Sequence, residues 1–493
     1  MNNKDNILSK KSEYRFSDVK KSFLSERVAR LIRICSNMDV PVLIIVDGFE
    51  NSGRGAVIND LVKDLDAKRY DVEVFEKNDY EDSKYPFIKR FWQNIPSKGR
   101  VKIFDRSFYF KLFNNLEYDK EELDRHIDNI KSIEHMLYDD QTIIIKFFLN
   151  ISKETQKERM EKIENTNRKS FYMQEIDEIQ NEKFDKYKDH IGYILEETDF
   201  PLIPWNIIDA NDISKASREV MGITLDELTK GIERVGNQRA DEKNITREYE
   251  GAPQILENLD LDKDISDEEY KELKDELQKR AADLMFEFYD RGISQVLVFE
   301  GVDAAGKDGS INRLVGEVDP RLYTVHAISA PTEEELNHHY LWRFYKKLPD
   351  NGYAGIFSRS WYGRVMVERV EGFATTREWD RAYDEILDME RQIYEHGSLV
   401  IKFFVVIDKE TQLERFKSRE DTPDKNYKIT DEDWRNRDKW DIYIEAMNEM
   451  LDRTNVDYAP WIIVEGNNKK YARIKVLKEY IKLCEEHLKK IDK

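Results

Sequence analysis

Residues 296–313 read VLVFEGVDAAGKDGSINR, and this stretch decides the fold. It opens with a short apolar run, residues 296–299, whose length and composition are typical of a buried parallel strand. A turn rich in small residues follows from Gly301 to Gly309, and a helical pattern begins near Ser310. Glycine lets a backbone approach a phosphate closely, and the first N–H groups of a helix lack partners. Strand, loop and helix in this order therefore predict a phosphate-binding loop.

The spacing Gly301-x4-Gly306-Lys307 matches the core of a P-loop, which places Lys307 for a terminal phosphate. The loop residues that we expect to contact phosphate are Gly301, Ala305, Gly306, Asp308 and Gly309. Asp308 departs from the usual pattern, because Ser or Thr normally holds Mg²⁺ at this position. Asp303, inside the loop, can supply the missing oxygen ligand, so we predict Mg²⁺ as the cofactor and Asp303 as its ligand.

The composition narrows the class of protein. A chain of 493 residues is long enough for two or more domains, and 40% hydrophobic residues suffice for proper cores. The formal net charge of −20 argues against a general nucleic-acid binder and against binding to acidic membranes. A polyanionic substrate stays compatible with this charge if specific Lys and Arg residues build a local basic channel.

Two cysteines, Cys35 and Cys484, make a disulfide framework an unlikely design and favour a reducing compartment. The first residues contain no apolar core of a signal peptide, and no run approaches the roughly 18 apolar residues of a membrane span. We therefore expect a cytoplasmic protein without a membrane partner. The sequence is compatible with a homo-oligomer but does not decide it.

The chain contains an internal repeat. Gly48 and Gly301 lie 253 residues apart, and further on Lys146 and Lys402 lie 256 residues apart. Many other residues pair at these two offsets; examples are Gly53 with Gly306, Arg90 with Arg343, Tyr109 with Tyr362, and Pro204-Trp205 with Pro460-Trp461. A period this long indicates a duplicated domain rather than a solenoid.

Each copy alternates strands with helices, which predicts a parallel sheet covered on both faces. The expected strands include residues 42–46, 101–104, 142–149 and 203–208 in the first copy and 296–299, 355–357, 399–407 and 461–464 in the second. The fold class is thus α/β, with two tandem P-loop kinase-like three-layer α/β/α domains, each with a helical lid. We place the domains at residues 1–236 and 257–493, joined by a polar linker at 237–256 that contains Gly251-Ala252-Pro253.

The two copies differ at the loop. The first has Arg54 where the second has Lys307, and Glu50 where the second has Asp303. Arginine is a poor substitute for a point-charge lysine on a phosphate, and the longer Glu50 would displace a bound metal. We infer that the first copy has lost phosphoryl transfer and instead shapes the second, while Arg54, Arg106 and Lys111 could retain affinity for anions.

At one position it is the second copy, not the first, that lacks an expected functional residue. The first copy keeps Asp105 in FDRS, whereas the second has Ser358 in FSRS. An acid at this strand end is the expected Mg²⁺ ligand of a P-loop fold, so its loss weakens the metal site of the second copy.

Several arginines follow the strand end of the second copy. Arg359 is well placed to pair with phosphate oxygens, and Arg364 and Arg369 follow it closely. A surface salt bridge to Glu368 or Glu371 is the alternative for Arg369 and Arg359. Upstream, the pattern from Pro331 predicts one capped helix that runs through Arg343.

The strongly polar stretch 415–439 lies where P-loop kinases carry a closing lid. Arg415, Arg419 and Lys428 are its candidate phosphate-binding residues, because lid cations neutralise phosphate charge and exclude water. A plain helical hairpin on the surface is the alternative.

Five ordered stretches resemble the type-2 polyphosphate kinases, and above all their tandem-domain polyphosphate:AMP phosphotransferases. They are GVDAAGKDGSINR, APTEEEL with LWR, FSRSWYGRVMVERVEGF, KITDEDWRNRDKW and APWIIVEG. By motif position, Asp303 and Lys307 would be the loop acid and lysine, Arg359 the arginine of the FxRS motif, and Lys428 the lid lysine. The chain departs from the family at Tyr427, where Trp is usual, and at Ser358, where many members have Asp or Asn.

The resemblance implies direct transfer of the terminal phosphate of inorganic polyphosphate to a nucleoside phosphate, with Mg²⁺. We expect conversion of AMP to ADP, with Asp303, Lys307 and Arg359 as catalytic residues. Three alternatives stay open: ADP as the acceptor, an ATP-dependent small-molecule kinase, and a polyphosphate-binding scaffold without catalysis.

Overall fold

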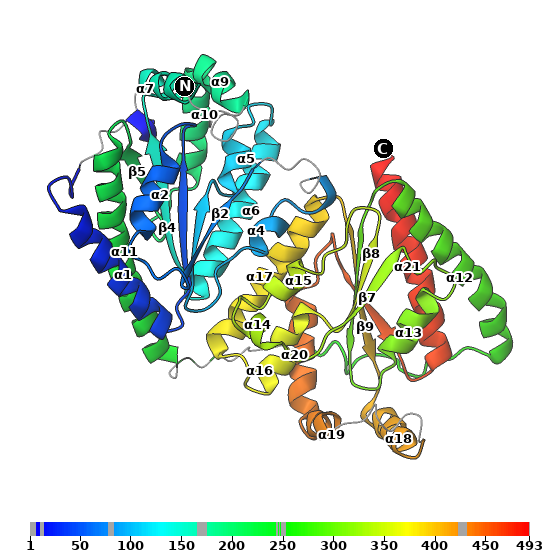
Figure 1. Ribbon diagram of the computed structural model, residues 1–493. Coiled ribbons are helices and arrows are strands. Elements are labelled where there is room, and N and C mark those ends of the chain that lie inside the picture. The colour runs from blue at the N-terminus through cyan, green and yellow to red at the C-terminus, as the bar shows by residue number, and fades with distance from the viewer. Residues whose placement is uncertain are drawn as a thin grey trace. The chain divides into compact units, whose positions relative to one another are not determined.

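The structure is a computed structural model, and it describes residues 6–9, 14–76, 83–164, 175–242, 245, 247, 253–422 and 431–492. The chain divides into two compact units. The first comprises residues 1–79, 90–243 and 333–339, and the second comprises 80–89, 244–332 and 340–493. Each unit contains one five-stranded parallel sheet (Figure 1).

The elements of the first half are η1 (Ile7–Ser9), α1 (Lys21–Asn37), β1 (Val42–Gly48), α2 (Arg54–Val62), β2 (Tyr70–Val74), α4 (Lys89–Trp92), β3 (Val101–Asp105), α5 (Tyr109–Phe113), α6 (Lys120–Asp139), β4 (Ile143–Asn150), α7 (Lys153–Glu164), α9 (Glu175–Glu182), α10 (Phe184–Glu197), β5 (Trp205–Asp209) and α11 (Ile213–Asp241).

The elements of the second half are α12 (Asp267–Asp290), β6 (Gln295–Gly301), α13 (Lys307–Leu314), β7 (Tyr323–Ala327), α14 (Glu333–Leu336), α15 (Trp342–Tyr345), β8 (Ala354–Ser358), η3 (Trp361–Arg364), α16 (Val367–Val370), α17 (Thr376–Glu395), β9 (Leu399–Val406), α18 (Lys409–Glu420), α19 (Asp431–Asp438), α20 (Trp440–Arg453), β10 (Trp461–Glu465) and α21 (Lys469–Ile491).

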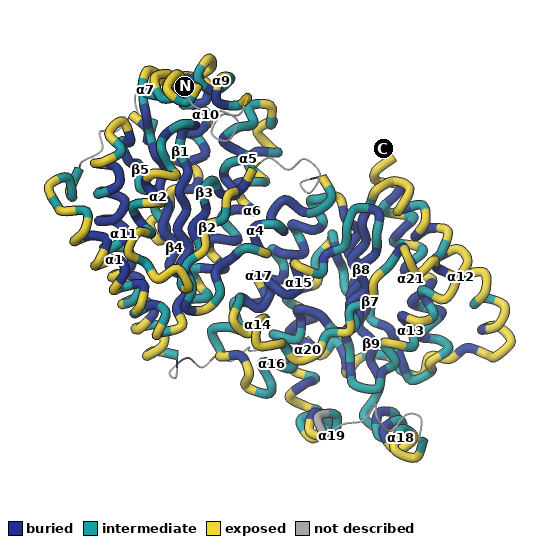
Figure 2. Tube along the Cα trace, in the orientation of Figure 1, coloured by how far each residue is buried: buried dark blue, intermediate teal, exposed yellow. Residues whose placement is uncertain are grey.

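The two sheets share one topology. The strand order is β2-β3-β1-β4-β5 in the first and β7-β8-β6-β9-β10 in the second, and every pairing is parallel. The strands that carry the loops, β1 and β6, lie at the centre because their residues are apolar on both faces. Figure 2 shows β1 buried, whereas helices such as α12 expose their outer faces. All residues of β1 and β6 but the last are buried. The predicted α/β fold with parallel sheets is confirmed.

Helices cover both faces of each sheet. In the second unit α12, α13 and α21 lie on one face, and α17 and α20 lie on the other (Figure 1). Local signals start these helices, since Ser266 Oγ accepts from Glu269 N at α12 and Thr375 forms a capping box with Glu378 at α17. None of the helices in the described parts of the chain is both long enough and apolar enough to cross a membrane.

Two details differ from the sequence prediction. The helix expected from Pro331 through Arg343 is instead two one-turn helices, α14 and α15. Tyr340, Leu341 and Trp342 are buried in succession, which one continuous helix with a single buried face does not allow. Residues 237–241, which we assigned to the linker, continue helix α11.

Candidate functional site

The loop between β6 and α13 has a shape that only glycine permits at two positions. Gly301 has φ +133°, and a Cβ atom there would lie 1.9 Å from the carbonyl oxygen of Val405. Gly306 has φ +111° and is the residue from which helix α13 begins. These two glycines turn the chain from the strand into the helix and leave the first N–H groups of α13 directed to the loop.

The three residues predicted as catalytic, Asp303, Lys307 and Arg359, line one cavity. Lys307 Nζ donates to the carbonyl oxygens of Gly301 at 2.7 Å and Val302 at 3.2 Å. Arg359 Nη2 donates to Asp303 Oδ1 at 3.1 Å. Arg359 reaches this position because it follows β8 with a left-handed φ of 63°. Residues 56 positions apart in the chain thus meet at the carboxyl edge of the sheet.

The charges of this group are coupled. Burial lowers the pKa of the Lys307 ammonium, and the positive Arg359 lowers it further, although Asp303 and Glu300 oppose both. Burial alone would raise the pKa of Asp303, but Lys307, Arg359 and Asn436 outweigh it and hold this pKa below its usual range. Because an opposite charge favours the ionised form of a lysine, an anion bound in the cavity would raise the pKa of Lys307 again.

The cavity has a volume of about 710 Å³, a size typical of small-molecule sites. Its basic lining residues are Lys307, Arg359, Arg415, Arg419, Lys469 and Arg473. The loop residues Ala305, Gly306, Asp308 and Gly309 also line it. The cavity is therefore suited to a ligand with several negative charges, although the chain as a whole is acidic.

Sequence reasoning missed Lys469 and Arg473, which lie in the first turns of α21. Comparison of the two copies could have revealed them. At the 256-residue offset the first copy has Ile213 and Ser217 where the second has these two basic residues. Basic residues thus line the cavity wall in the second copy only.

Arg415 has a structural task. Its guanidinium donates to the carbonyls of Ala304 and Ala305, both at 2.9 Å, and to those of Gly466 and Asn467. In the first copy Arg159 bonds four carbonyls in the same way, those of Asn51, Ser52, Ala210 and Asn211. Because both copies use this arginine in the same way, its shared role is to support the loop. The role of Arg415 as a phosphate ligand stays a prediction.

The other predicted phosphate ligands have different surroundings. Arg419 lines the cavity. Arg364 forms an ion pair with Glu368 at 2.9 Å, and its guanidinium lies over the ring of Tyr340. Arg369 pairs with Glu449 at 2.6 Å. Lys428 lies outside the described residues.

Asn436, another residue that sequence reasoning missed, holds the second oxygen of Asp303. Asn436 Nδ2 donates to Asp303 Oδ2 at 2.9 Å, and Asn436 Oδ1 accepts from Tyr443 at 3.1 Å. The Tyr443 hydroxyl, which has a single hydrogen to donate, also lies 3.3 Å from Glu371 Oε1. Glu371 pairs with Arg435 at 3.1 Å and Lys439 at 3.0 Å. Helices α19 and α20 are thereby connected to the loop acid.

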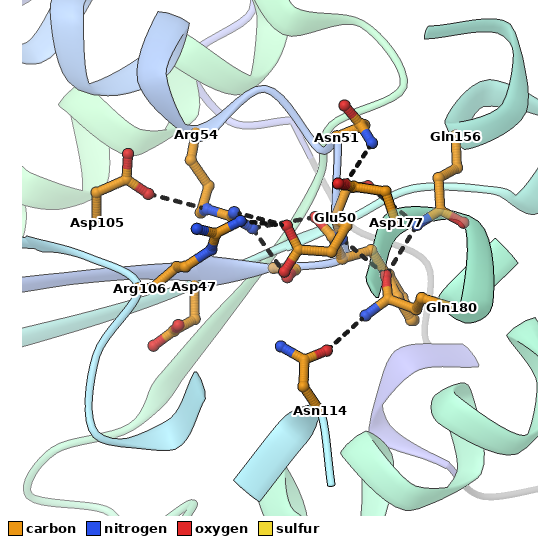
Figure 3. A network of polar contacts seen from close by, with 12 residues as sticks. Asp47, Glu50, Asn51, Arg54, Asp105, Arg106, Asn114, Gln156, Asp177 and Gln180 are labelled. Atoms are coloured by element: carbon orange, nitrogen blue, oxygen red, sulfur yellow. Dashed lines mark hydrogen bonds and ion pairs between the residues drawn. The ribbon is translucent and has the colours of Figure 1, made fainter. Parts of the chain in front are cut away.

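The first copy fills the equivalent space with its own side chains (Figure 3). Arg54 bonds Asp105 at 2.9 Å, Glu50 at 3.0 Å and two loop carbonyls, and Arg106 bonds the same Glu50 at 2.8 Å. Arg54 is 10% exposed and Arg106 is 11% exposed, whereas Arg359 of the second copy is 42% exposed. Glu50 and Asp105 together supply two carboxylates for the two guanidinium groups of Arg54 and Arg106, which argues against the anion affinity that we expected of these arginines.

We expect the ion pairs around Arg54 to contribute to the stability of the folded first copy. We expect Arg54→Met to lower the free energy of unfolding by about 3 kcal/mol, because it leaves the buried Glu50 and the partly exposed Asp105 with fewer charged partners. Chemical denaturation measures this loss. Arg100→Met, which breaks the exposed pair with Asp71, is the matched control and should cost under about 1 kcal/mol. Equal losses for the two variants would contradict this role of Arg54.

Comparisons with known proteins identify the family of the chain. The profile of the family Polyphosphate kinase 2 (PPK2) matches residues 9–234 and again 264–492. A polyphosphate:AMP phosphotransferase of Pseudomonas aeruginosa is 40% identical over 449 residues, 89% of each chain. The protein of the same name from Acinetobacter johnsonii is 34% identical over 90% of each chain.

A crystal structure assigned to polyphosphate kinase 2 from Pseudomonas aeruginosa superposes with a TM-score of 0.83 and 36% identity, and it covers 98% of both chains. The family profile accounts for both copies, and the likeness in sequence and in fold extends over nearly the whole chain. The chain therefore belongs to the polyphosphate kinase 2 family, as a member with two tandem domains.

Proposed function

We propose that this chain transfers the terminal phosphate of inorganic polyphosphate to AMP and so forms ADP. The observation that carries the proposal is the cavity of the second copy, where the P-loop lysine Lys307 and the helix residues Lys469 and Arg473 line one space. Relatives that are 34–40% identical are named polyphosphate:AMP phosphotransferases, which supports AMP as the acceptor.

The transfer that we propose is direct. An oxygen of the AMP phosphate attacks the terminal phosphorus of polyphosphate, a new P–O bond forms, and the bond to the next phosphate breaks. The products are ADP and a polyphosphate chain that is one unit shorter. Lys307, Arg359 and Arg419 stabilise the charge on the transferred group and on the departing chain, and no covalent enzyme intermediate is needed.

Mg²⁺ fits the residues of the cavity. Asp303 and Asp308 supply carboxylate oxygens and Ser358 supplies a hydroxyl, which are the hard donors that Mg²⁺ prefers. Asp303 Oδ1 accepts from Arg359 and Asp303 Oδ2 accepts from Asn436, so each oxygen keeps a further lone pair for a metal. We propose that Asp303 holds Mg²⁺ together with substrate phosphates, where the ion would neutralise phosphate charge and orient the reacting groups.

We propose that only the second copy, which we place within residues 257–493, is catalytic. Ion pairs of Arg54 occupy the first loop, and Ile213 and Ser217 replace the basic residues of the cavity wall. Both cysteines are free and buried, which fits a reducing compartment, and we propose that the reaction takes place in the cytoplasm.

The test is to incubate the protein with AMP, Mg²⁺ and polyphosphate and to measure ADP by chromatography. ADP should form, and ATP in place of polyphosphate should support far less product. Turnover with ATP alone would favour the ATP-dependent kinase, and binding of polyphosphate without any turnover would favour the scaffold.

Replacing AMP by ADP in the same assay tests the second acceptor. This candidate has a specific basis, because an ADP-polyphosphate phosphotransferase of Rhizobium meliloti is 39% identical over 38% of this chain.

The contact of Asn436 with Asp303 leads to a prediction. Asn436→Ala should lower kcat by about 10- to 100-fold, because the loop acid loses the group that orients it. Steady-state kinetics measure this effect. Asn448→Ala is the matched control, since Asn448 is another buried asparagine that bonds Leu256 and Glu257 instead. An unchanged kcat in Asn436→Ala, or an equal loss in Asn448→Ala, would rule out this positioning role.

A further inference from the structure

In each copy one carboxylate stands near the phosphate-binding loop, but the two copies carry it on different elements: the end of the neighbouring strand or the start of the loop helix. In the first copy Asp105 ends β3 and lies opposite Val46 in the register, while helix α2 has Gly55 as its second residue. In the second copy Ser358 ends β8 and lies opposite Phe299, which is the equivalent register position, while α13 has Asp308 as its second residue. The first copy thus has the acid at the strand end, and the second copy has it at the helix start.

The exchanged residues meet in space. Ser358 Oγ donates to Asp308 Oδ1 at 3.0 Å, and both side chains line the 710 Å³ cavity that also contains Lys307 and Asp303. In the first copy Asp105 Oδ1 accepts from Arg54 Nε at 2.9 Å, so that carboxylate is bound by the residue that replaced the lysine. Only the second copy thus presents this carboxylate together with a hydroxyl to the cavity.

A hydroxyl and a carboxylate are the pair with which P-loop enzymes hold Mg²⁺. In the usual arrangement Ser or Thr at the start of the loop helix supplies the hydroxyl, and an acid from a neighbouring strand end supplies the carboxylate. Here the same two groups are present at the same two places but in exchanged positions. The chemistry of the pair does not depend on which backbone carries which group, provided that both reach the ion.

We propose that Asp308 is the relocated Mg²⁺-binding carboxylate of this enzyme and that Ser358 is its hydroxyl partner. The inference rests on the proposed function, because it concerns the metal of that reaction. Asp308 would also compensate for Ser358, because the helix then supplies the carboxylate that the strand end of the second copy lacks. Asp303 and Asp308 are then the two protein carboxylates of the centre.

Exchange variants test the proposal. Asp308→Asn keeps an oxygen that can accept from Ser358 but removes the charge, and the double variant Asp308→Asn with Ser358→Asp returns the carboxylate to the strand end. Two measurements apply to each variant: Mn²⁺ binding to the protein alone by electron paramagnetic resonance, and the Mg²⁺ concentration that gives half-maximal formation of ADP. Asp319→Asn is the matched control, because this exposed acid pairs with Arg321 away from the cavity.

We expect Asp308→Asn to weaken Mn²⁺ binding and to raise the required Mg²⁺ concentration by about 10- to 100-fold. The double variant should recover both values to within about threefold, and Asp319→Asn should change neither. The proposal is overturned if Asp308→Asn binds Mn²⁺ like the wild type, or if the double variant is no better than Asp308→Asn. Thermal unfolding checks that each variant is folded, and recovery in the double variant excludes a general folding defect.

The proposed function has a separate outcome. If the wild type forms no ADP from AMP and polyphosphate, that function fails, whereas Mn²⁺ binding without nucleotide still decides the role of Asp308.

Discussion

Replacing Lys307 by methionine should lower kcat for the phosphorylation of AMP by about 100- to 1,000-fold. Methionine keeps much of the length of the side chain but removes the ammonium, which loses one preorganised charge at the place where negative charge develops. The fold of the loop should persist, because Gly301 and Gly306 determine its path and Arg415 bonds its carbonyls. Steady-state formation of ADP at saturating Mg²⁺ measures the effect.

Arg54→Met is the internal control for this experiment, because Arg54 occupies the equivalent position of the first copy. It should leave kcat within about threefold of the wild type while it lowers stability. The opposite result, with turnover lost in Arg54→Met and kept in Lys307→Met, would reverse the roles of the two copies.

The largest loss of stability is expected from Lys402→Met. Lys402 lies in β9 and is fully buried, and its Nζ bonds Glu390 at 2.8 Å, the carbonyl of Thr454 at 2.8 Å and the hydroxyl of Tyr362 at 3.1 Å. Burial lowers the pKa of Lys402, and Glu390 opposes that shift. Removal of the ammonium leaves a buried carboxylate without its cation, which should cost about 3–5 kcal/mol in urea denaturation.

Two further variants separate this effect from simple loss of packing. Adding Glu390→Gln to Lys402→Met removes the uncompensated charge and should recover a large part of the loss. Arg321→Met, which breaks an exposed pair with Asp319, should cost under about 1 kcal/mol. No recovery in the double variant would show that packing rather than charge dominates.

The fold could be predicted because local signals and the repeat agreed. Apolar runs such as residues 296–299 can be buried only as central strands, and the second copy repeats the pattern of the first. The failures occurred where local pattern was ambiguous. Tyr340, Leu341 and Trp342 are all buried in succession, so no helical face could be read there and the break between α14 and α15 was missed.

The site could be predicted only in part, since sequence gives residue types but not partners. The loop motif predicts Lys307 and Asp303, and the FxRS strand end predicts Arg359; all three line the cavity. Asn436 was missed because its contact with Asp303 joins residues 133 positions apart. The sequence shows that Arg54 and Glu50 differ from their counterparts in the second copy, but it does not show that they pair with each other.

The closed ion network of the first copy also bears on how this duplicated chain can change over generations. An Arg54→Lys reversion would restore an amine, but Glu50 and Asp105 would lose bonds to a guanidinium that an ammonium cannot replace. The basic residues that the second copy has at the positions of Ile213 and Ser217 would still be missing, so this first step should cost stability before it could gain any catalysis. We therefore expect the ion network to oppose a return of activity in a copy that we propose to be inactive, while its sequence can drift as long as the charges stay balanced.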